Sequence, residues 1–334
     1  MGPIEPKESK RRVEIFKIGE GLPPAILLKP SEIPERVKTQ IRWLMKPDPT
    51  RFFIHMTLAW VVIFSAIGIA EHFQKLWLTV LMLLVVATRQ NVLGLLVHEQ
   101  VHLLGVRSRG WADIVTNCFC AYPLFISVES YGNVHLSHHR FFFTDKDPDY
   151  HRKQGEEWTF PQQVKLFLTT LFMDVTGLSL RKFIRGKRDA HGLGVELIKK
   201  PAALKWLRIG YYVGLSAVLT YTQCWSLFLF YWILPLATAL QAIVRWGAIA
   251  EHKYNLLDPT VAEATPLIEP KWWEKLLLPN LNFSLHIYHH YWPSIPASNL
   301  PIVHKIFKRE GLLEEQNVFH GNWDYLKFLF RQKR

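Results

Sequence analysis

Four long apolar stretches constrain the fold of this chain more than any other feature of its sequence. A helix needs about 20 residues to cross the roughly 30 Å hydrocarbon core of a bilayer, and each stretch is near that length. Only a few residues connect the first stretch to the second and the third to the fourth, so the sequence predicts two membrane hairpins. The expected spans are residues 52–70, 76–97, 206–222 and 225–246.

The basic residues are distributed unevenly around these stretches. Lys and Arg total 40 against 28 Asp and Glu, yet the two hairpin turns contain only Lys75. Most of the others precede the first hairpin, fill the central loop or follow the second hairpin. The positive-inside rule therefore predicts that both termini and the central loop are cytoplasmic. The basic excess marks a membrane face, and we expect no nucleic acid partner.

The pattern predicts an all-α integral membrane protein with interfacial helices and a cytosolic, histidine-rich cap. The apolar stretch 113–128 is predicted to be re-entrant or interfacial, and 163–184 reads as an amphipathic interfacial helix. Three cysteines exclude a disulfide scaffold, and the first 50 residues show no signal peptide. The expected parts are a cytosolic segment 1–50, a membrane domain 51–310 and a cytosolic tail 311–334.

Nine of the 15 histidines form a pattern at the predicted cytoplasmic rim. Positions i, i+3 and i+4 share one helix face, so the motifs HLSHH and HIYHH each aim three imidazoles in one direction. One HxxxH pair is a weak signal, whereas two HxxHH motifs in one chain are a strong one. The remaining histidines, among them His304 and His320, are isolated in sequence. The candidate metal ligands are His98, His102, His135, His138, His139, His252, His286, His289 and His290.

Nine imidazoles are too many for one metal ion, so the pattern predicts two ions. Zinc has no redox chemistry, and its catalytic sites usually have three protein ligands. Two iron ions can instead bind and split dioxygen when two electrons are supplied from outside. For a site at the membrane rim, the expected substrate is an unactivated C–H bond of a chain that enters from the bilayer.

The ordered motifs HEQVH, HLSHH, EH and HIYHH resemble those of the membrane fatty acid desaturase and hydroxylase family. The strings ATRQNVLGLLVHEQVH, HHRFFFTDKDPDY, RWGAIAEH and HHYWPSIPASNLP look like those of bacterial members, and the resemblance covers about residues 50–310. It implies four spans beneath a cytosolic cap with a diiron centre, in a bacterial inner membrane or the endoplasmic reticulum. It also implies that dioxygen and two electrons remove two hydrogens from an acyl chain to form a double bond.

Carried over, the resemblance makes the eight motif histidines iron ligands and matches His252 to a further ligand of acyl desaturases. In those enzymes an asparagine four residues earlier holds a metal-bound water, whereas this chain has Ala248. Ligating histidines usually donate their other N–H to a carboxylate or carbonyl. Residues expected to orient the ligands or line the bundle beneath them are Glu99, Asp145, Asp147, Asp149, Glu251, Arg245 (through a salt bridge to Glu251) and Arg89.

Other readings remain open on the sequence. HEQVH is also the HExxH pattern of zinc proteases, with Glu99 as general base, but that reading leaves seven histidines unused. A metal transporter would place its ligands within the spans rather than at their ends. The same iron chemistry can also hydroxylate a lipid or alkane, or form a ketone on a carotenoid, and DKDPDYH resembles the matching region of carotenoid ketolases.

No electron-transfer module is evident in the segments that flank the spans. We therefore expect a separate acidic electron carrier, a ferredoxin or a b-type cytochrome, that docks on the basic cytoplasmic face. Candidate docking residues are RKFIRGKR (181–188), Lys271 and Lys275, although the first of these equally suits anionic lipid headgroups. Trp272 and Trp273 are predicted to anchor the chain at the membrane interface.

Overall fold

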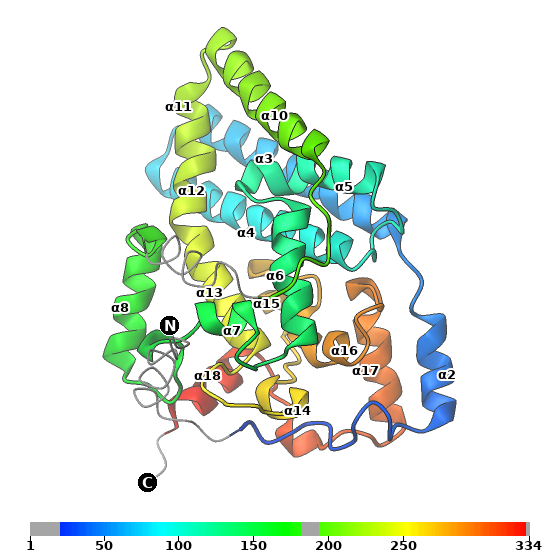
Figure 1. Ribbon diagram of the computed structural model, residues 1–334. Coiled ribbons are helices and arrows are strands. Elements are labelled where there is room, and N and C mark those ends of the chain that lie inside the picture. Colours follow the sequence, from blue (N-terminus) through cyan, green and yellow to red (C-terminus); the bar gives the residue numbers. More distant parts are fainter. Residues whose placement is uncertain (1–20, 182–193, 332–334) are drawn as a thin grey trace, which may run out of the picture.

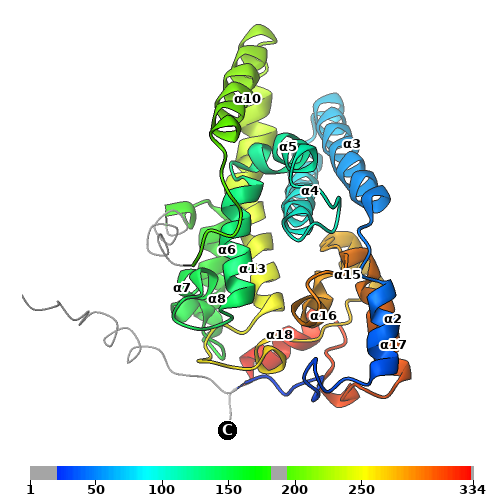
Figure 2. The ribbon, with the colours of Figure 1, turned by 45° about the vertical axis from the view of Figure 1, so that its right-hand side comes forward.

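The computed structural model describes residues 21–181 and 194–331, and within these ranges the chain is helical. The described residues form no sheet, and their β contact is an isolated bridge between Ile268 and Phe319. The prediction of an all-α chain is thus confirmed. Long helices fill the upper part of the molecule in Figures 1 and 2, and short helices form a cap below them.

The first hairpin consists of α3 (Pro49–Phe73) and α4 (Leu76–Val101), which pack against each other. The side chain of Asp48 accepts a hydrogen bond from the backbone N–H of Arg51 and so caps the N-terminus of α3. The residues that α3 buries are spaced at helical intervals, and several are alanines, which let two helix backbones approach closely. They include Ala59, Ile63, Ala66 and Ala70.

The second hairpin joins α10 (Ala202–Tyr221) to a long helical run, Trp225–Glu251. This run is irregular, because a π-helical turn at Leu229–Ile233 frees backbone carbonyls within an apolar environment. The amide of Gln90 on α4 donates to the carbonyl of Trp232 over 2.8 Å, which satisfies one of them. The run comprises α11 (Trp225–Phe228), the π turn, α12 (Leu234–Ala237) and α13 (Ala239–Glu251).

By length and apolar character, three helices in the described ranges are able to cross a membrane: α3, α4 and the run Trp225–Glu251. The prediction of four such helices is therefore confirmed only in part. The expected span 206–222 is helical within α10, but Lys205, Arg208 and its tyrosines make α10 less apolar than the other three.

The apolar stretch 113–128, expected to be re-entrant or interfacial, covers the first helix and the bend of a helix pair, Trp111–Leu124 and Val128–Arg140, with an angle of 88° between the two helices. Such a bend fits either a broken span or a re-entrant loop. In the pair, α5 (Trp111–Thr116) continues through a π turn (Asn117–Ala121) and a 3-10 turn (Tyr122–Leu124), whereas α6 (Val128–Arg140) turns down toward the cap.

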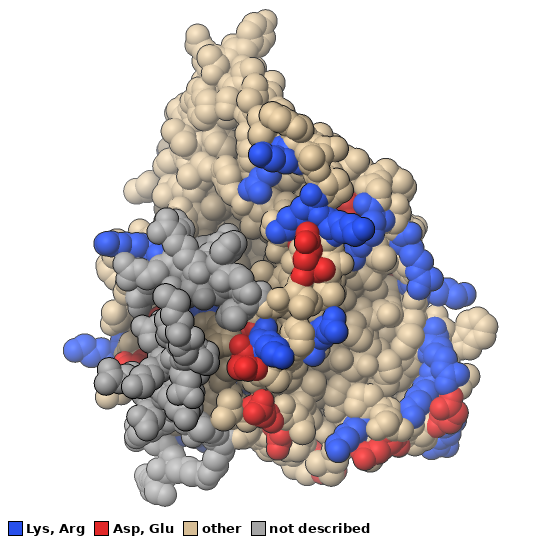
Figure 3. Space-filling model, viewed as in Figure 1, with Lys and Arg blue, Asp and Glu red and all other residues tan. Residues whose placement is uncertain are grey.

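The cap packs around an apolar cluster that joins α2 (Glu35–Trp43), α16 (His286–Tyr291) and α17 (Leu300–Arg309). Ile41, Tyr288 and Phe307 are fully buried there. In Figure 3 the upper tip of the molecule is free of charged side chains, while Lys, Arg, Asp and Glu lie farther down. The other helices of the lower part are α7 (Pro148–Arg152), α8 (Val164–Val175), α14 (Val261–Ala264), α15 (Trp272–Leu277) and α18 (Asn322–Phe330).

Two predicted interfacial segments expose apolar side chains. In α8, Leu168 and Phe172 are more than half exposed, whereas Asp174 on the opposite face is buried. In α15, Trp272 and Leu276 are more than 70% exposed, whereas Glu274 is buried. Helices with one exposed apolar face and one buried polar contact suit the boundary between lipid and protein. Most of the predicted motif RKFIRGKR (181–188) lies outside the described residues.

Candidate metal centre

The nine candidate histidines come from four separate parts of the chain and meet in one place. Helix α4 extends beyond its apolar stretch, so its last turn carries His98 into the cap. Helix α6 packs against that end of α4 at Gly132, where a Cβ atom would lie 3.1 Å from a methyl group of Val101. The absence of a side chain at Gly132 thus brings the HLSHH motif beside HEQVH.

Five of the histidines form a first group, whose ligand atoms all lie within 4.8 Å of one another. Within it, the Nε2 atom of His135 lies 2.8 Å from Nε2 of His102 and 3.0 Å from Nε2 of His139. Nε2 of His139 in turn lies 3.1 Å from Nε2 of His289. The members are His98, His102, His135, His139 and His289.

A second group contains His138, His252 and His290, again within 4.8 Å. Nε2 of His138 lies 3.3 Å from Nε2 of His252. His286 adjoins this group, since its Nε2 atom lies 3.1 Å from Nε2 of His290. The rings of His139 and His290 stack at 4.3 Å, so the two groups share an edge. All nine predicted ligands are therefore in one cluster.

The donor set fits a pair of metal ions. A neutral imidazole has one N–H and one lone pair, so several Nε2 atoms that converge on one point cannot all hydrogen-bond to each other. Both ring nitrogens of buried His98, and Nδ1 of buried His286, have no hydrogen-bond partner. An orphaned buried nitrogen is costly unless something else binds it. Imidazole nitrogens suit iron, zinc, copper and nickel.

Burial within the cluster favours the neutral form of several of its imidazoles, the form that binds metals. Burial lowers the pKa of His102 to about 3. Burial also lowers the pKa of His252, His286, His289 and His290 well below the usual value, and the neighbouring histidines lower each of them further. These lone pairs are therefore free of protons near neutral pH.

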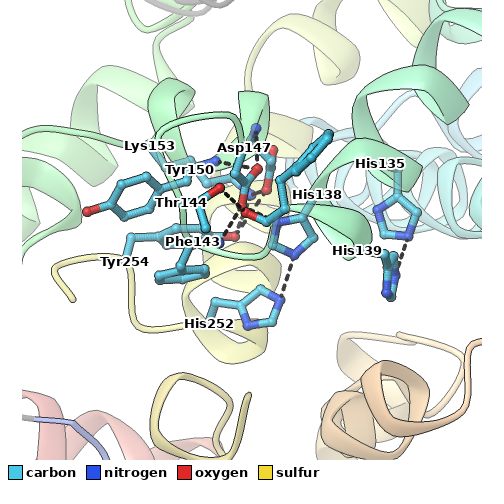
Figure 4. A network of polar contacts seen from close by, with 12 residues as sticks. His135, His138, His139, Phe143, Thr144, Asp147, Tyr150, Lys153, His252 and Tyr254 are labelled. Carbon is cyan, nitrogen blue, oxygen red and sulfur yellow. Dashed lines mark hydrogen bonds and ion pairs between the residues drawn. The ribbon is translucent and has the colours of Figure 1, made fainter. Parts of the chain in front are cut away.

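A fully buried carboxylate, Asp147, orients His138 (Figure 4). Its Oδ2 atom lies 2.8 Å from Nδ1 of His138 and accepts the backbone N–H of Phe143 over 2.9 Å. Its Oδ1 atom accepts the backbone N–H groups of Asp149 and Tyr150 and so caps α7. Since a carboxylate only accepts hydrogen bonds, it holds the proton of His138 on Nδ1 and leaves Nε2 directed at His252.

The family of the chain follows from a family model. A model described as fatty acid desaturase matches residues 75–321, a range that contains all nine histidines and Asp147. The chain belongs to the fatty acid desaturase family. No curated protein matches its sequence.

Of the acids predicted to orient the ligands in this desaturase-family chain, Asp147 is the one whose side chain bonds a cluster histidine among the described residues. Asp149 instead accepts from Nζ of Lys153 over 2.6 Å, and Lys153 also contacts the hydroxyl of Tyr254 over 2.5 Å (Figure 4). Burial opposes ionisation of Asp149, but Lys153 and Arg152 together with the other nearby groups outweigh it and hold the pKa of that carboxyl below its usual range. Asp149 and Lys153 thus form a partly buried ion pair next to Asp147 in sequence.

Other predicted residues have different partners. The carboxylate of Glu99 faces the backbone N–H of Ala297 at 3.3 Å and so links α4 to the segment that follows the HIYHH motif. This contact does not favour the zinc-protease reading, in which Glu99 would act on substrate. Asp145 is exposed and has no side-chain bond to a cluster histidine. Glu251 is the last residue of α13, directly before His252.

The two predicted arginines also lie away from the ligands. The expected partner of Arg245 was Glu251, but Arg245 pairs with Asp174 on α8, and Asp174 is only 1% exposed. Six residues of helix put Arg245 and Glu251 on different faces of α13, which explains the difference. Arg89 bonds to the hydroxyl of the preceding Thr88.

Sequence reasoning missed Thr265. This buried residue places its hydroxyl, which can donate or accept, 3.2 Å from Nδ1 of His252, so it contacts the same ring nitrogen there that Asp147 contacts in His138. Nothing in its sequence surroundings, EATPL, signals the contact, because Thr265 is 13 residues from the histidine that it bonds. The aromatic rings of Phe142 and Phe283 lie 5.0 Å and 4.5 Å from His290 and His98 and shield the cluster from water.

Proposed function

We propose that the chain is a membrane-bound, dioxygen-dependent fatty acid desaturase that introduces a C=C bond into an acyl chain supplied by the bilayer. The observation that carries the proposal is the convergence of nine imidazoles at the cap-side ends of apolar helices, in a chain of the desaturase family. The first group of five histidines would hold one iron ion. The second group, together with His286, would hold the other. Bound iron would supply the redox chemistry that dioxygen activation requires.

The overall reaction balances without a further cofactor. The acyl chain loses two hydrogens, a separate carrier supplies two electrons, the medium supplies two protons, and dioxygen becomes two waters. The protein's own residues would bind and orient. Asp147 and Thr265 fix the rings of His138 and His252, and Phe142 and Phe283 exclude water from the cluster. Exclusion of water protects a strongly oxidising site from side reactions.

The orientation proposed here follows the positive-inside rule, with the termini and the histidine cluster on the cytoplasmic side. On the face shown in Figure 3, the charge-free tip and the charged lower part support this placement, because α3, α4 and the beginning of the run Trp225–Glu251 belong to the upper part. The substrate would then enter from the bilayer, and the electron carrier would approach from the aqueous side.

Expression in a bacterial host that lacks polyunsaturated lipids tests the function. We expect new double bonds in its acyl chains by gas chromatography and mass spectrometry, and their loss in His102→Ala. The purified protein should hold about two irons and little zinc per chain, since zinc lacks the required redox chemistry. New hydroxylated or ketone-bearing lipids would favour the hydroxylase or ketolase reading, and stoichiometric zinc under iron-replete conditions would contradict the proposal.

The electron carrier is proposed to be a small acidic protein, a ferredoxin or a b-type cytochrome, that docks by charge. Lys271, the N-cap residue of α15, and Lys275, in its last turn, are both exposed, and they are the described docking candidates. We expect turnover with the reduced carrier to fall as salt rises, because a Debye length shrinks from about 10 Å at 0.1 M to about 3 Å at 1 M. Turnover that does not change with salt would rule out docking by charge.

Lys271→Glu/Lys275→Glu tests the location of this contact. The double variant should slow reduction by the carrier and leave iron content unchanged. Lys29→Glu/Lys46→Glu, on two exposed residues that precede α3, is the matched control because it changes the surface charge by the same amount. Equal slowing in the control would mean that the overall charge, and not α15, attracts the carrier.

A further inference from the structure

Helix α16, which carries three of the nine histidines, is only six residues long and has no side-chain cap at its N-terminus. Helices this short are marginal on their own, so contacts with the rest of the fold must set the orientation of α16. Successive helical residues are about 100° apart, which puts Tyr288 about 200° from His286, and nearly opposite the mean direction of the three histidines. Tyr288 therefore points away from the metal centre.

A series of hydrogen bonds from Tyr288 through His304 to Glu269 holds the side of α16 that faces away from the metal centre. The hydroxyl of fully buried Tyr288 lies 2.9 Å from Nδ1 of His304 on α17. Nε2 of His304 lies 2.7 Å from a carboxylate oxygen of Glu269. The carboxylate can only accept, so Nε2–H of His304 donates to Glu269, and in that tautomer Nδ1 accepts from the Tyr288 hydroxyl.

Glu269, the last residue of this hydrogen-bonded series, is itself fixed to the cap. The backbone N–H of Glu269 donates to the carbonyl of Phe319 over 2.8 Å, beside the isolated bridge between Ile268 and Phe319. Two further basic side chains, His320 at 3.3 Å and Lys308 at 3.6 Å, lie near the Glu269 carboxylate. His304 is isolated in sequence, and in the structure its two ring nitrogens link Tyr288 on α16 to Glu269.

We propose that His304, held between Glu269 and Tyr288, is a positioning residue that fixes the rotation of α16 and hence the aim of His286, His289 and His290. Side chains reach about 5–6 Å from a helix axis, so a 10° rotation of α16 would move their ends by about 1 Å. Sites of this kind tolerate about 0.5 Å. The inference rests on the proposed metal centre, because it concerns how tightly that centre is held.

Iron retention against a chelator measures this role apart from turnover. In His304→Leu the ring can no longer accept from Tyr288, and in Tyr288→Phe only the hydroxyl is lost. Both should release iron about tenfold faster than the wild type or more, as expected when a group that orients ligands is lost. His304→Gln, which keeps one donor and one acceptor, should restore much of the retention.

Val303→Ala is the matched control, because Val303 is a fully buried neighbour on α17 whose truncation lowers stability but removes no hydrogen bond from Tyr288. We expect it to lower the melting temperature and to hold iron like the wild type. Retention in His304→Leu equal to that of Val303→Ala would overturn the inference. If His304→Leu does not fold, wild-type retention in Tyr288→Phe would overturn it equally. A wild-type chain that retains no iron would instead refute the proposed metal centre itself.

Discussion

Replacement of His138 with alanine should abolish double-bond formation and remove about one of the two irons per chain. His138 is 2% exposed, and its Nε2 atom faces His252 while its Nδ1 atom is bonded to Asp147. Alanine leaves the second group with His252, His290 and His286, and it also leaves the Asp147 carboxylate buried without its histidine. Both changes oppose metal binding at that group, whereas the five histidines of the first group remain in place.

Iron per chain by elemental analysis and acyl composition by mass spectrometry check this result. His72→Ala is the control, because His72 is exposed at the end of α3, far in sequence from the histidine motifs. It should retain both irons and the wild-type lipid product. Full iron content or an unchanged product in His138→Ala would mean that His138 is not a ligand. Loss of both irons would mean that the two groups bind metal cooperatively.

The sequence predicted the elements of the site better than their limits. The apolar stretch 76–97 ends where charged and polar residues begin, but α4 continues to Val101. Likewise the stretch 225–246 is extended to Glu251. Hydropathy marks the part of a helix that suits lipid, while the backbone hydrogen bonds that define the helix continue into the cap. These extensions are the turns that carry His98 and precede His252.

Helical spacing also predicted which imidazoles share a face, since i, i+3 and i+4 relations are local. It could not predict how the histidines divide, because that depends on packing between distant helices. His138 and His139 are neighbours in sequence, yet they belong to different groups. Asp147 and Asp145 are two residues apart in sequence, but their side chains point in different directions. Asp147 caps α7 and faces His138, whereas Asp145 is exposed. Sequence proximity contains no information on that direction.

Asp147→Asn should reduce both iron affinity and desaturation by about 10–100-fold, the usual effect of losing a group that orients a metal ligand. The carboxylate accepts from His138 and the Phe143 N–H on one oxygen, and from the Asp149 and Tyr150 N–H groups on the other. An amide has one accepting oxygen and one donating nitrogen. In either orientation its NH₂ group faces N–H donors in a fully buried position, which costs about 1–3 kcal/mol.

The two orientations of the amide in Asp147→Asn would fail in different ways, and the variant's stability separates them. With its nitrogen toward His138, the amide forces the ring proton onto Nε2 and removes the lone pair that a metal needs, while the cap of α7 survives. With its nitrogen toward Asp149 and Tyr150, the cap is lost and the melting temperature falls further. We expect the first outcome, because it keeps two backbone hydrogen bonds at the cap. Asp145→Asn, at an exposed acid, should change neither iron affinity nor stability. Wild-type iron affinity in Asp147→Asn would show that Asp147 does not set the tautomer of His138.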